Sequence, residues 1–580
     1  MRHPSLTLLF DAGARAAFQM LAGTAGLGSP PERQALFPRY ARYYVALARL
    51  PRRARRALQR RWRRSLAAIA LLLTLGQAPA LAATLTVAPG AAPDIVPDGS
   101  CSLIEAIENA NVDARTHADC LSGSGADTIV LPAASTQTLT QVHNSTYGAT
   151  GLPVIGSAVT IDGNGSTIKR NSTAPQFRIL AVNFPGNLTV KESTVSGGNT
   201  ADSGGGILGG ALTLMNSTVS GNTAGSGGGI YGGAPTLMNS IVSGNYARLD
   251  GGGVSNRGTA TLTKSTVSGN SAGGRGGGLF NDDNGTLTLT NSTISGNSTS
   301  SNGGGVFNDS YLGPQRRFYG TVTLTNSTVY GNSAAGGGGG LHNLARLFLT
   351  NSTVSGNMTA GNGGGVDTPY GTITLTNSTV TGNRSGGTGG GVHMDSQSLY
   401  ESSILTLDRT LVSGNTAPAG PEISNTPGAY GSATVIANNF NLLGHSGFSN
   451  AQVFSGFTPG ATDLTPTSDG AAPKALDTIL DTALADNGGA TKTHALVLGS
   501  PAIDAVETGC PPPATDQRGI SRPQALACDI GAFEGAIPRT ADLAIGLSDA
   551  PDPVPVDGQL LYTFTAERRP GGGHGRTGQR

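Results

Sequence analysis

The sequence predicts an all-β fold, a single-stranded parallel β-helix, and three observations support this prediction. Glycine supplies 88 of the 580 residues, about twice its usual share, which disfavours helix over most of the chain. One phrase recurs from about residue 193 to 415: Asn-Ser-Thr-Val-Ser-Gly-Asn, a glycine triplet with an aliphatic residue, then Thr-Leu-Thr-Leu-Thr. The apolar residues of each segment alternate with a period of two, which is typical of strands.

The phrase also sets the length of one coil. The Asn that ends this phrase in each coil lies at positions 199, 222, 245, 270, 297, 332, 357, 383 and 415, so most coils hold about 25 residues. Leucine-rich repeats are of similar length but need helical or long apolar segments, which this repeat lacks. Three short strands per coil, with coils about 4.8 Å apart, give a parallel β-helix.

Stacked coils place like residues above like residues. We expect two internal columns, one of leucine and one of valine: Leu289, Leu324, Leu349 and Leu375, and Val219, Val267, Val329, Val354 and Val380. Asn222, Asn245, Asn270 and their equivalents should form an amide ladder at a corner, where each side chain bonds its neighbours. The Asn-Ser-Thr phrases also match the N-glycosylation pattern, but the repeat itself accounts for them.

The charge of the chain is divided unevenly. The net charge is +1, yet residues 1–64 carry 14 Arg and two acidic residues. Residues 65–566 are mildly acidic, so we expect no nucleic-acid partner for that part. We also expect no transmembrane segment, because no run approaches 18 apolar residues.

A signal peptide is predicted at 60–82. An Arg cluster precedes the short apolar run 65–75, and Ala80-Leu81-Ala82 supplies small residues for cleavage before Ala83. A buried core helix at 65–75 would have to tolerate that Arg cluster. We interpret residues 1–59 as an extension read from a start codon placed too early, and we expect export.

The four cysteines form two local pairs, Cys101 with Cys120 and Cys510 with Cys528. In an exported chain each pair predicts a disulfide, worth about 3 kcal/mol. Metal binding would need Cys and His clustered at ligand spacing, which is not seen.

Two stretches resemble known surface proteins. Cys101-Ser-Leu-Ile-Glu-Ala-Ile107 resembles the Cys-Ser-Leu-Arg-Glu-Ala motif of secreted bacterial β-helix proteins, with Ile104 in place of Arg. The repeats are similar to those of polymorphic outer-membrane proteins. These resemblances imply a right-handed, pectate-lyase-like solenoid and name no reaction.

The C-terminal part carries further resemblances. Gly499-Ser-Pro-Ala-Ile-Asp504, Asp516-Gln-Arg-Gly519 and Asp529-Ile-Gly-Ala-Phe-Glu534 resemble a choice-of-anchor domain (Q type), and 541–565 resembles two strands of an immunoglobulin-like surface repeat. The expected organisation is an extension (1–59), a signal peptide (60–82), an N-terminal cap with the first coils (83–192), β-helix repeats (193–426), last coils with the choice-of-anchor-like domain (427–535), a truncated surface-repeat domain (536–566) and an aberrant basic tail (567–580).

Two long coils suggest a binding groove. Their insertions, 311–319 and 394–402, follow the same strand of the coil, three coils or about 14 Å apart. The expected walls and floor are Tyr311, Arg316, Arg317, Phe318 and Tyr319, facing Tyr400 and Glu401, above His342, Asn343 and Asp367. Aromatic rings with Arg and carboxylates suit a sugar chain, although two surface loops of tolerated length would look the same.

The sequence contains no clear catalytic constellation. Asp282 and Asp309 occupy the same place on successive coils and could lie about 5 Å apart, as in a retaining glycosidase, but stacking alone imposes that spacing. A lyase would need clustered carboxylates for calcium, and the acidic residues here are dispersed. We therefore expect no cofactor, with calcium left open.

The predicted function is structural and adhesive. We expect a secreted or cell-surface β-helix stalk, associated with the outer membrane, that binds a polysaccharide or a surface protein as a monomer. A polysaccharide lyase or glycoside hydrolase on the same fold is the alternative, because fold alone does not separate them.

Overall fold

A computed structural model describes residues 82–282, 284–312, 317–396, 402–426, 431–535, 543–550 and 561–568. The signal peptide and extension lie before this part, apart from Ala82. Contacts divide the chain into Met1–Leu81 and Ala82–Arg580, and only the second unit is described below. Among its described residues, helix is limited to α4 (Leu103–Val112), α5 (Asn450–Val453) and the 3-10 helix η1 (Leu476–Thr478).

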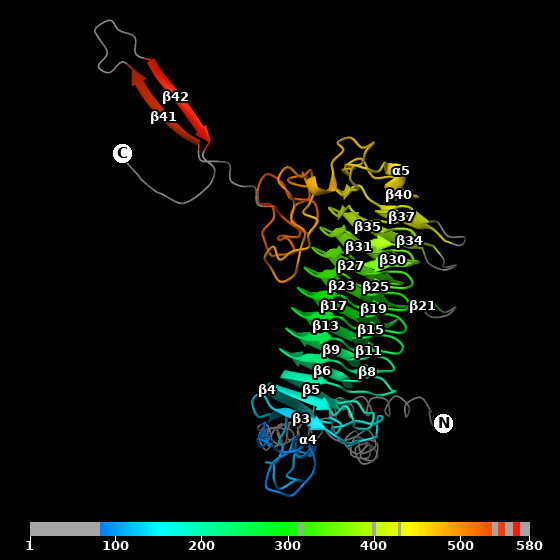
Figure 1. The fold of residues 1–580 in the computed structure, drawn as a ribbon, viewed down its shortest axis with the longest axis vertical. Coiled ribbons are helices and arrows are strands. Elements are labelled where there is room, and N and C mark those ends of the chain that lie inside the picture. Colours follow the sequence, from blue (N-terminus) through cyan, green and yellow to red (C-terminus); the bar gives the residue numbers. More distant parts are fainter. Residues whose placement is uncertain are drawn as a thin grey trace, which may run out of the picture. The chain divides into compact units, whose positions relative to one another are not determined.

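The second unit contains the predicted right-handed parallel β-helix (Figure 1). It opens with long or early strands: β1 (Thr84–Thr86), β2 (Asp127–Val130), β3 (Thr136–Leu139), β4 (Ala158–Arg170), β5 (Leu180–Ser196), β6 (Ile207–Met215) and β9 (Ile230–Met238). Ser102 and Glu105 form a capping box that starts α4, which packs its buried face against β2 and β4. None of the helices formed by the described residues has the length and apolarity to span a lipid bilayer.

Each later coil contributes strands to parallel ladders. The threonine ladder is β13 (Thr259–Thr263), β17 (Thr286–Thr290), β23 (Thr321–Thr325), β27 (Arg346–Thr350), β31 (Gly371–Thr376), β35 (Ser403–Asp408) and β38 (Ala433–Ile436). The valine ladder is β7 (Thr218–Ser220), β10 (Ile241–Ser243), β14 (Thr266–Ser268), β18 (Thr293–Ser295), β24 (Thr328–Tyr330), β28 (Thr353–Ser355), β32 (Thr379–Thr381), β36 (Leu411–Val412) and β39 (Leu442–Leu443).

Two more ladders complete the coil. The flank ladder, whose first six strands follow glycine triplets, is β12 (Val254–Asn256), β16 (Leu279–Asn281), β20 (Val306–Asn308), β26 (Leu341–Asn343), β30 (Val366–Thr368), β34 (Val392–Asp395), β37 (Ile423–Thr426) and β40 (Phe454–Ser455). The short ladder is β8 (Thr223–Ala224), β11 (Tyr246–Ala247), β15 (Ser271–Ala272), β19 (Ser298–Thr299), β25 (Ser333–Ala334), β29 (Met358–Thr359) and β33 (Arg384–Ser385). This fourth strand was not expected, because two residues show no alternation.

The internal columns form as predicted. Leu289 pairs with Leu324 on the next coil, and Val329 pairs with Val354, all with no more than 1% of the side chain exposed. Because every inward position repeats along the stack, the apolar core inside the coils is one continuous column, and a second apolar cluster joins Leu411 and Leu442 to the C-terminal segment.

The predicted amide ladder is also present. Each Nδ2 donates to Oδ1 of the next coil at 2.8–2.9 Å, from Asn222 to Asn415. Asn415 donates to the buried Glu422 at 2.7 Å, which ends the ladder. A second corner uses left-handed backbone at the first Asn of Asn-Ser-Thr, with φ of 50° at Asn216 and 45° at Asn377. Asn tolerates that conformation better than most residues, which gives these Asn positions a structural role.

The C-terminal segment 464–535, orange in Figure 1, lies against the valine ladder. Thr328 Oγ1 donates to the carbonyl of Lys492 at 2.7 Å, and Thr353 Oγ1 donates to Gln517 Oε1 at 2.6 Å. The outward threonines of earlier coils are half-buried, whereas Thr353 is fully buried here. Beyond this segment, β41 (Leu543–Ala550) and β42 (Leu561–Arg568) pair antiparallel.

Asp516, Arg522, Asp529 and Glu534 are buried ionisable residues in this segment. Arg522 Nη1 donates to Glu534 Oε2 at 2.8 Å, and Glu534 also accepts the backbone N–H of Asp529. Asp529 Oδ1 accepts the N–H of Asp504 at 2.8 Å. Burial raises the pKa of Asp529 to about 7, with the neighbouring Glu534 acting in the same direction.

This shift predicts that stability falls as the pH rises. The unfolded Asp529 loses its proton near pH 3.8, whereas the folded one keeps it to about pH 7. The native state therefore binds more protons in this window, and the free energy of unfolding should drop by about 4 kcal/mol across it. Urea unfolding at pH 4.5 and pH 8 measures the part of this drop above pH 4.5, about 3 kcal/mol. Asp529→Asn should flatten the dependence, and exposed Asp477→Asn should not; an equal slope in both variants would refute the assignment.

Candidate functional site

The first insertion forms a hairpin beside the flank ladder. β21 (Ser310–Leu312) pairs antiparallel with β22 (Arg317–Tyr319), so that Tyr311 lies opposite Phe318. It follows directly from β20, and 51% of Tyr311 is exposed. Arg316 and the side chains of Arg317 and Phe318 lie outside the described residues. The hairpin therefore offers at least one exposed aromatic ring to a ligand.

The second insertion leaves the same ladder. It follows β34, which is three pairing steps from β20 through β26 and β30. Tyr400 and Glu401, the expected opposite wall, lie outside the described residues. A groove between the two insertions stays a prediction.

The expected floor of the groove is not an open surface. His342, Asn343 and Asp367 are 5%, 0% and 4% exposed. The glycine-rich turn of the coil lies over His342 and Asp367, since a methyl group at Gly337 would come within 2.0 Å of Asp367 Oδ2 and 3.3 Å of His342 Nδ1. The sequence identified these positions on the correct strand but could not show that the preceding turn covers them.

The covered side chains form one column along the flank ladder. Phe280, Phe307 and His342 lie on successive coils, with ring centroids 5.7 and 4.9 Å apart and nearly parallel planes. The Arg275 guanidinium lies over both phenylalanine rings, 4.8 and 4.9 Å from their centroids. Such contacts fix the position of the cation and of the rings.

The column continues into a buried ionisable cluster. Asp367 Oδ1 lies 2.7 Å from His393 Nδ1, and its Oδ2 lies 2.9 Å from His342 Nδ1 outside hydrogen-bond geometry. Burial acts to raise the pKa of Asp367, but the contacts with both histidines outweigh it and hold that pKa below its usual value. An ionised Asp367 between two imidazoles serves to hold three coils together.

The two weak catalytic candidates are both held in ion pairs. Asp282 Oδ2 lies 2.7 Å from Arg257 Nε, and Asp309 Oδ2 lies 2.8 Å from Arg275 Nη1. Burial raises the pKa of Asp309, although Arg275 opposes this effect. Arg275 also contacts Asp250 at 3.1 Å. Asp309 is thus a partly buried carboxylate in a fixed network, which suits hydrogen bonding to a ligand as well as structure.

Sequence reasoning missed this network. Arg275 directly precedes a glycine triplet, and its two carboxylate partners, Asp250 and Asp309, come from different coils. Tyr370 also lies near enough to Asp309 and Arg275 for their charges to act on its hydroxyl, while burial raises its pKa. The only available signal was an Arg in a turn position that the preceding coil fills with Asp250 and the other coils fill with small or amide residues.

The cysteines lie in two close pairs. Cys101 and Cys120 form a disulfide with Cα atoms 4.6 Å apart, and Cys510 and Cys528 form another at 6.1 Å. In the part of the chain that the structure describes, no three His, Cys, Asp or Glu side chains gather as metal ligands would. The expectation about cofactors, calcium included, therefore stays a prediction.

Comparisons with known proteins concern the fold alone. No protein-family model and no curated protein matches the sequence. The crystal structure of pectate lyase Pel9A is similar, with 18% sequence identity and a TM-score of 0.39, over 78% of this chain and 96% of that one. At this level the likeness gives no information about activity or substrate.

Proposed function

We propose that this chain is an exported, cell-surface or extracellular β-helix protein that acts as an adhesive stalk and binds glycans or surface proteins along its flank ladder. The observation that supports this most is the hairpin β21–β22. It interrupts an otherwise regular solenoid and exposes Tyr311 beside the network of Arg275 and Asp309. Insertions in repeat proteins commonly carry the binding function.

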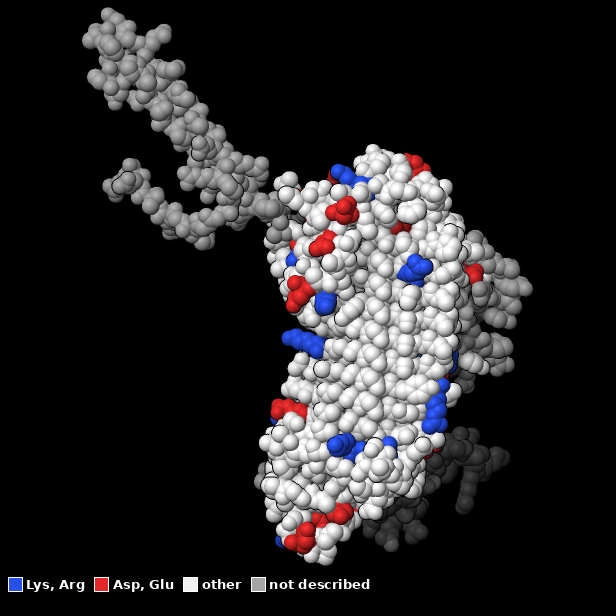
Figure 2. Space-filling model, in the orientation of Figure 1, with Lys and Arg blue, Asp and Glu red and all other residues white. Residues whose placement is uncertain are grey.

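The chemistry of the flank suits carbohydrate. An exposed aromatic ring stacks on the apolar face of a sugar, and fixed charged groups bond its hydroxyls. Tyr319 contributes a second ring, with the Arg346 guanidinium 5.3 Å from its centroid. Figure 2 shows few charged side chains over the middle of the solenoid. That face therefore lacks a broad charged surface that could attract a charged ligand.

We expect the double variant Arg317→Ala with Tyr319→Ala to lose retention on a polysaccharide array. It removes a cation and a ring from the hairpin while leaving the ladders unchanged. Tyr246→Ala is the matched control, because Tyr246 is 42% exposed on the short ladder, away from the hairpin strands. Unchanged retention of the double variant would dismiss the hairpin as the binding site.

Export and surface location belong to the same proposal. The signal-peptide pattern at 60–82 supports it, and so does the position of both cysteine pairs at disulfide distance. The mass of the mature secreted protein tests the start at Ala83 and both disulfides together. A retained leader or reduced cysteines would contradict export.

An enzyme on the same fold is the second candidate. The raised pKa of Asp309, with the charge of Asp282 among its causes, is the feature that favours a general acid. Incubation with acidic and neutral polysaccharides, with and without calcium, would reveal unsaturated products or new reducing ends. Product formation that Asp309→Asn abolishes would replace the adhesive function with a lyase or hydrolase.

A further inference from the structure

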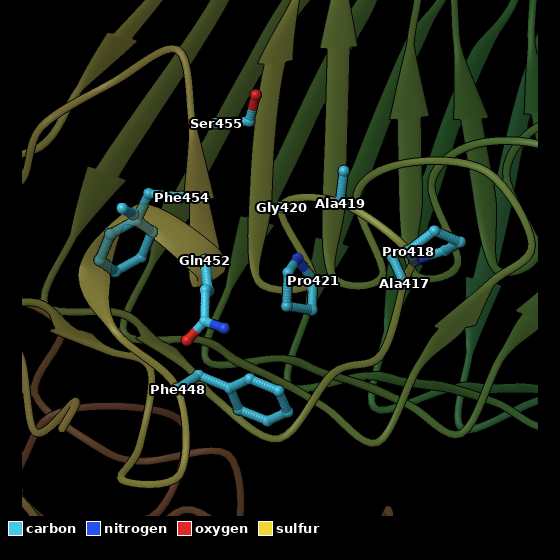
Figure 3. A pocket seen from close by; sticks show the side chains of 10 residues that line it. Ala417, Pro418, Ala419, Gly420, Pro421, Phe448, Gln452, Phe454 and Ser455 are labelled. Carbon is cyan, nitrogen blue, oxygen red and sulfur yellow. The ribbon is translucent and has the colours of Figure 1, made fainter.

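A small pocket lies at the last coils, far along the chain from the hairpin. The turn 417–421 forms one side, and α5 with β40 forms the other (Figure 3). Its volume is about 320 Å³, near the lower end for ligand sites. None of its lining residues carries a charge. A neutral ligand of the size of one sugar ring fits these properties.

The polar group of the pocket has a fixed orientation. Gln452 Oε1 accepts the backbone N–H of Ser449 at 2.8 Å, as part of the capping box of α5. Only the amide oxygen can accept that hydrogen, so the assignment of oxygen and nitrogen is settled. The Nε2 group therefore points the other way, toward the space between Pro421 and Phe448 (Figure 3). It offers a hydrogen-bond donor in an uncharged pocket.

The apolar walls are held in place as well. Phe448 is 40% exposed, and its ring is nearly perpendicular to that of His445, with centroids 5.7 Å apart. Phe454 is 6% exposed and packs edge-on against Phe457 at 5.2 Å. Pro421 faces these rings across the pocket (Figure 3). An aromatic face and a proline ring thus enclose the donor of Gln452.

We propose that this pocket binds the acetamido group of an N-acetylated sugar. The carbonyl oxygen accepts from Gln452 Nε2, the methyl group packs against the proline and alanine side of the pocket, and the sugar ring stacks on Phe448. An amide donor among apolar walls selects a carbonyl that carries a methyl group over a plain hydroxyl, because a hydroxyl would leave the apolar wall uncovered. The proposal is independent of the hairpin.

Ligand-observed NMR on the full-length secreted protein tests this proposal, with N-acetylglucosamine and glucose as probes. We expect N-acetylglucosamine to bind at least tenfold more tightly than glucose. Gln452→Glu keeps an oxygen that accepts the Ser449 N–H but replaces the donor, so it should weaken binding at least tenfold. Phe448→Ala should do the same, and Leu498→Ala, which changes an 82% exposed side chain outside the pocket, should not.

Three results with the pocket itself would overturn the assignment. They are equal affinity for both sugars, binding that Gln452→Glu leaves unchanged in a protein with a native circular dichroism spectrum, and preference for N-acetylproline amide, which would make the pocket a peptide site. The Arg317→Ala with Tyr319→Ala variant separates the two proposals. It should lose polysaccharide retention and still bind N-acetylglucosamine, whereas loss of both would place the acetamido sugar at the hairpin.

Discussion

Gly304→Ala should prevent the coils from closing onto one another. A methyl group at Gly304 would come within 2.4 Å of the carbonyl oxygens of both Gly339 and Ser333, which are backbone atoms of the neighbouring coil and turn. Neither atom can withdraw without breaking the stack. We expect the free energy of unfolding to fall by about 3 kcal/mol or more, at the upper end for overpacking.

Gly233→Ala is the matched control for this prediction. Nothing lies within 4 Å of the position that its methyl group would take, so its stability should be close to that of the natural chain. Urea unfolding followed by circular dichroism compares the two variants. Equal unfolding midpoints would mean that the triplet glycine does not face a neighbouring coil.

Asn297→Ala should cost about 4 kcal/mol of the free energy of unfolding. Its Oδ1 accepts from the backbone N–H and the Nδ2 of Asn270 at 3.0 and 2.9 Å, and its Nδ2 donates to the carbonyl of Val267 and to Asn332 Oδ1 at 2.9 Å each. The side chain is fully buried. Without this side chain its bonding partners stay buried with no hydrogen-bond partner, and each such group lowers the free energy of unfolding by about 1–3 kcal/mol.

The exposed corner supplies the control for Asn297. Asn239 Nδ2 donates to Asn216 Oδ1 at 2.8 Å in solvent, and Asn239→Gly keeps the left-handed backbone that this corner needs. We expect a change within about 0.5 kcal/mol, because water replaces an exposed bond. Chemical unfolding of both variants measures the contrast. A similar small loss for Asn297→Ala would show that the amide ladder is not a buried structural element.

The fold could be predicted because its determinants are local and periodic. Alternation at Leu287 and Leu289 identifies an inward face within one coil, and the repeat then places Leu324 on the same column. The amide ladder follows from the same logic, since a buried Asn recurring once per coil can satisfy its donor and acceptor on equivalent neighbours. No long-range information was needed for either feature.

The features that the sequence did not predict depend on contacts between residues that are far apart in the sequence, or on glycine-rich turns. Thr328 meets Lys492 across a sequence separation of 164 residues, and nothing in the repeat marks that coil as the covered one. The burial of His342 and Asp367 depends on how the preceding glycine turn lies over them. The orientation of Gln452 in its pocket likewise depends on one capping hydrogen bond to Ser449, which cannot be predicted from a single Ser and Gln in the sequence.

The stacking of like residues on consecutive coils can be tested most directly by a distance. Thr213 and Thr374 lie on one outward column of the solenoid, joined by six pairing steps. At about 4.8 Å a step, their Cα atoms should be about 29 Å apart. Double electron–electron resonance between spin labels on Thr213→Cys and Thr374→Cys should give a single narrow distribution near that value, allowing for the label arms. A broad distribution, or a distance far from it, would contradict the stacked solenoid.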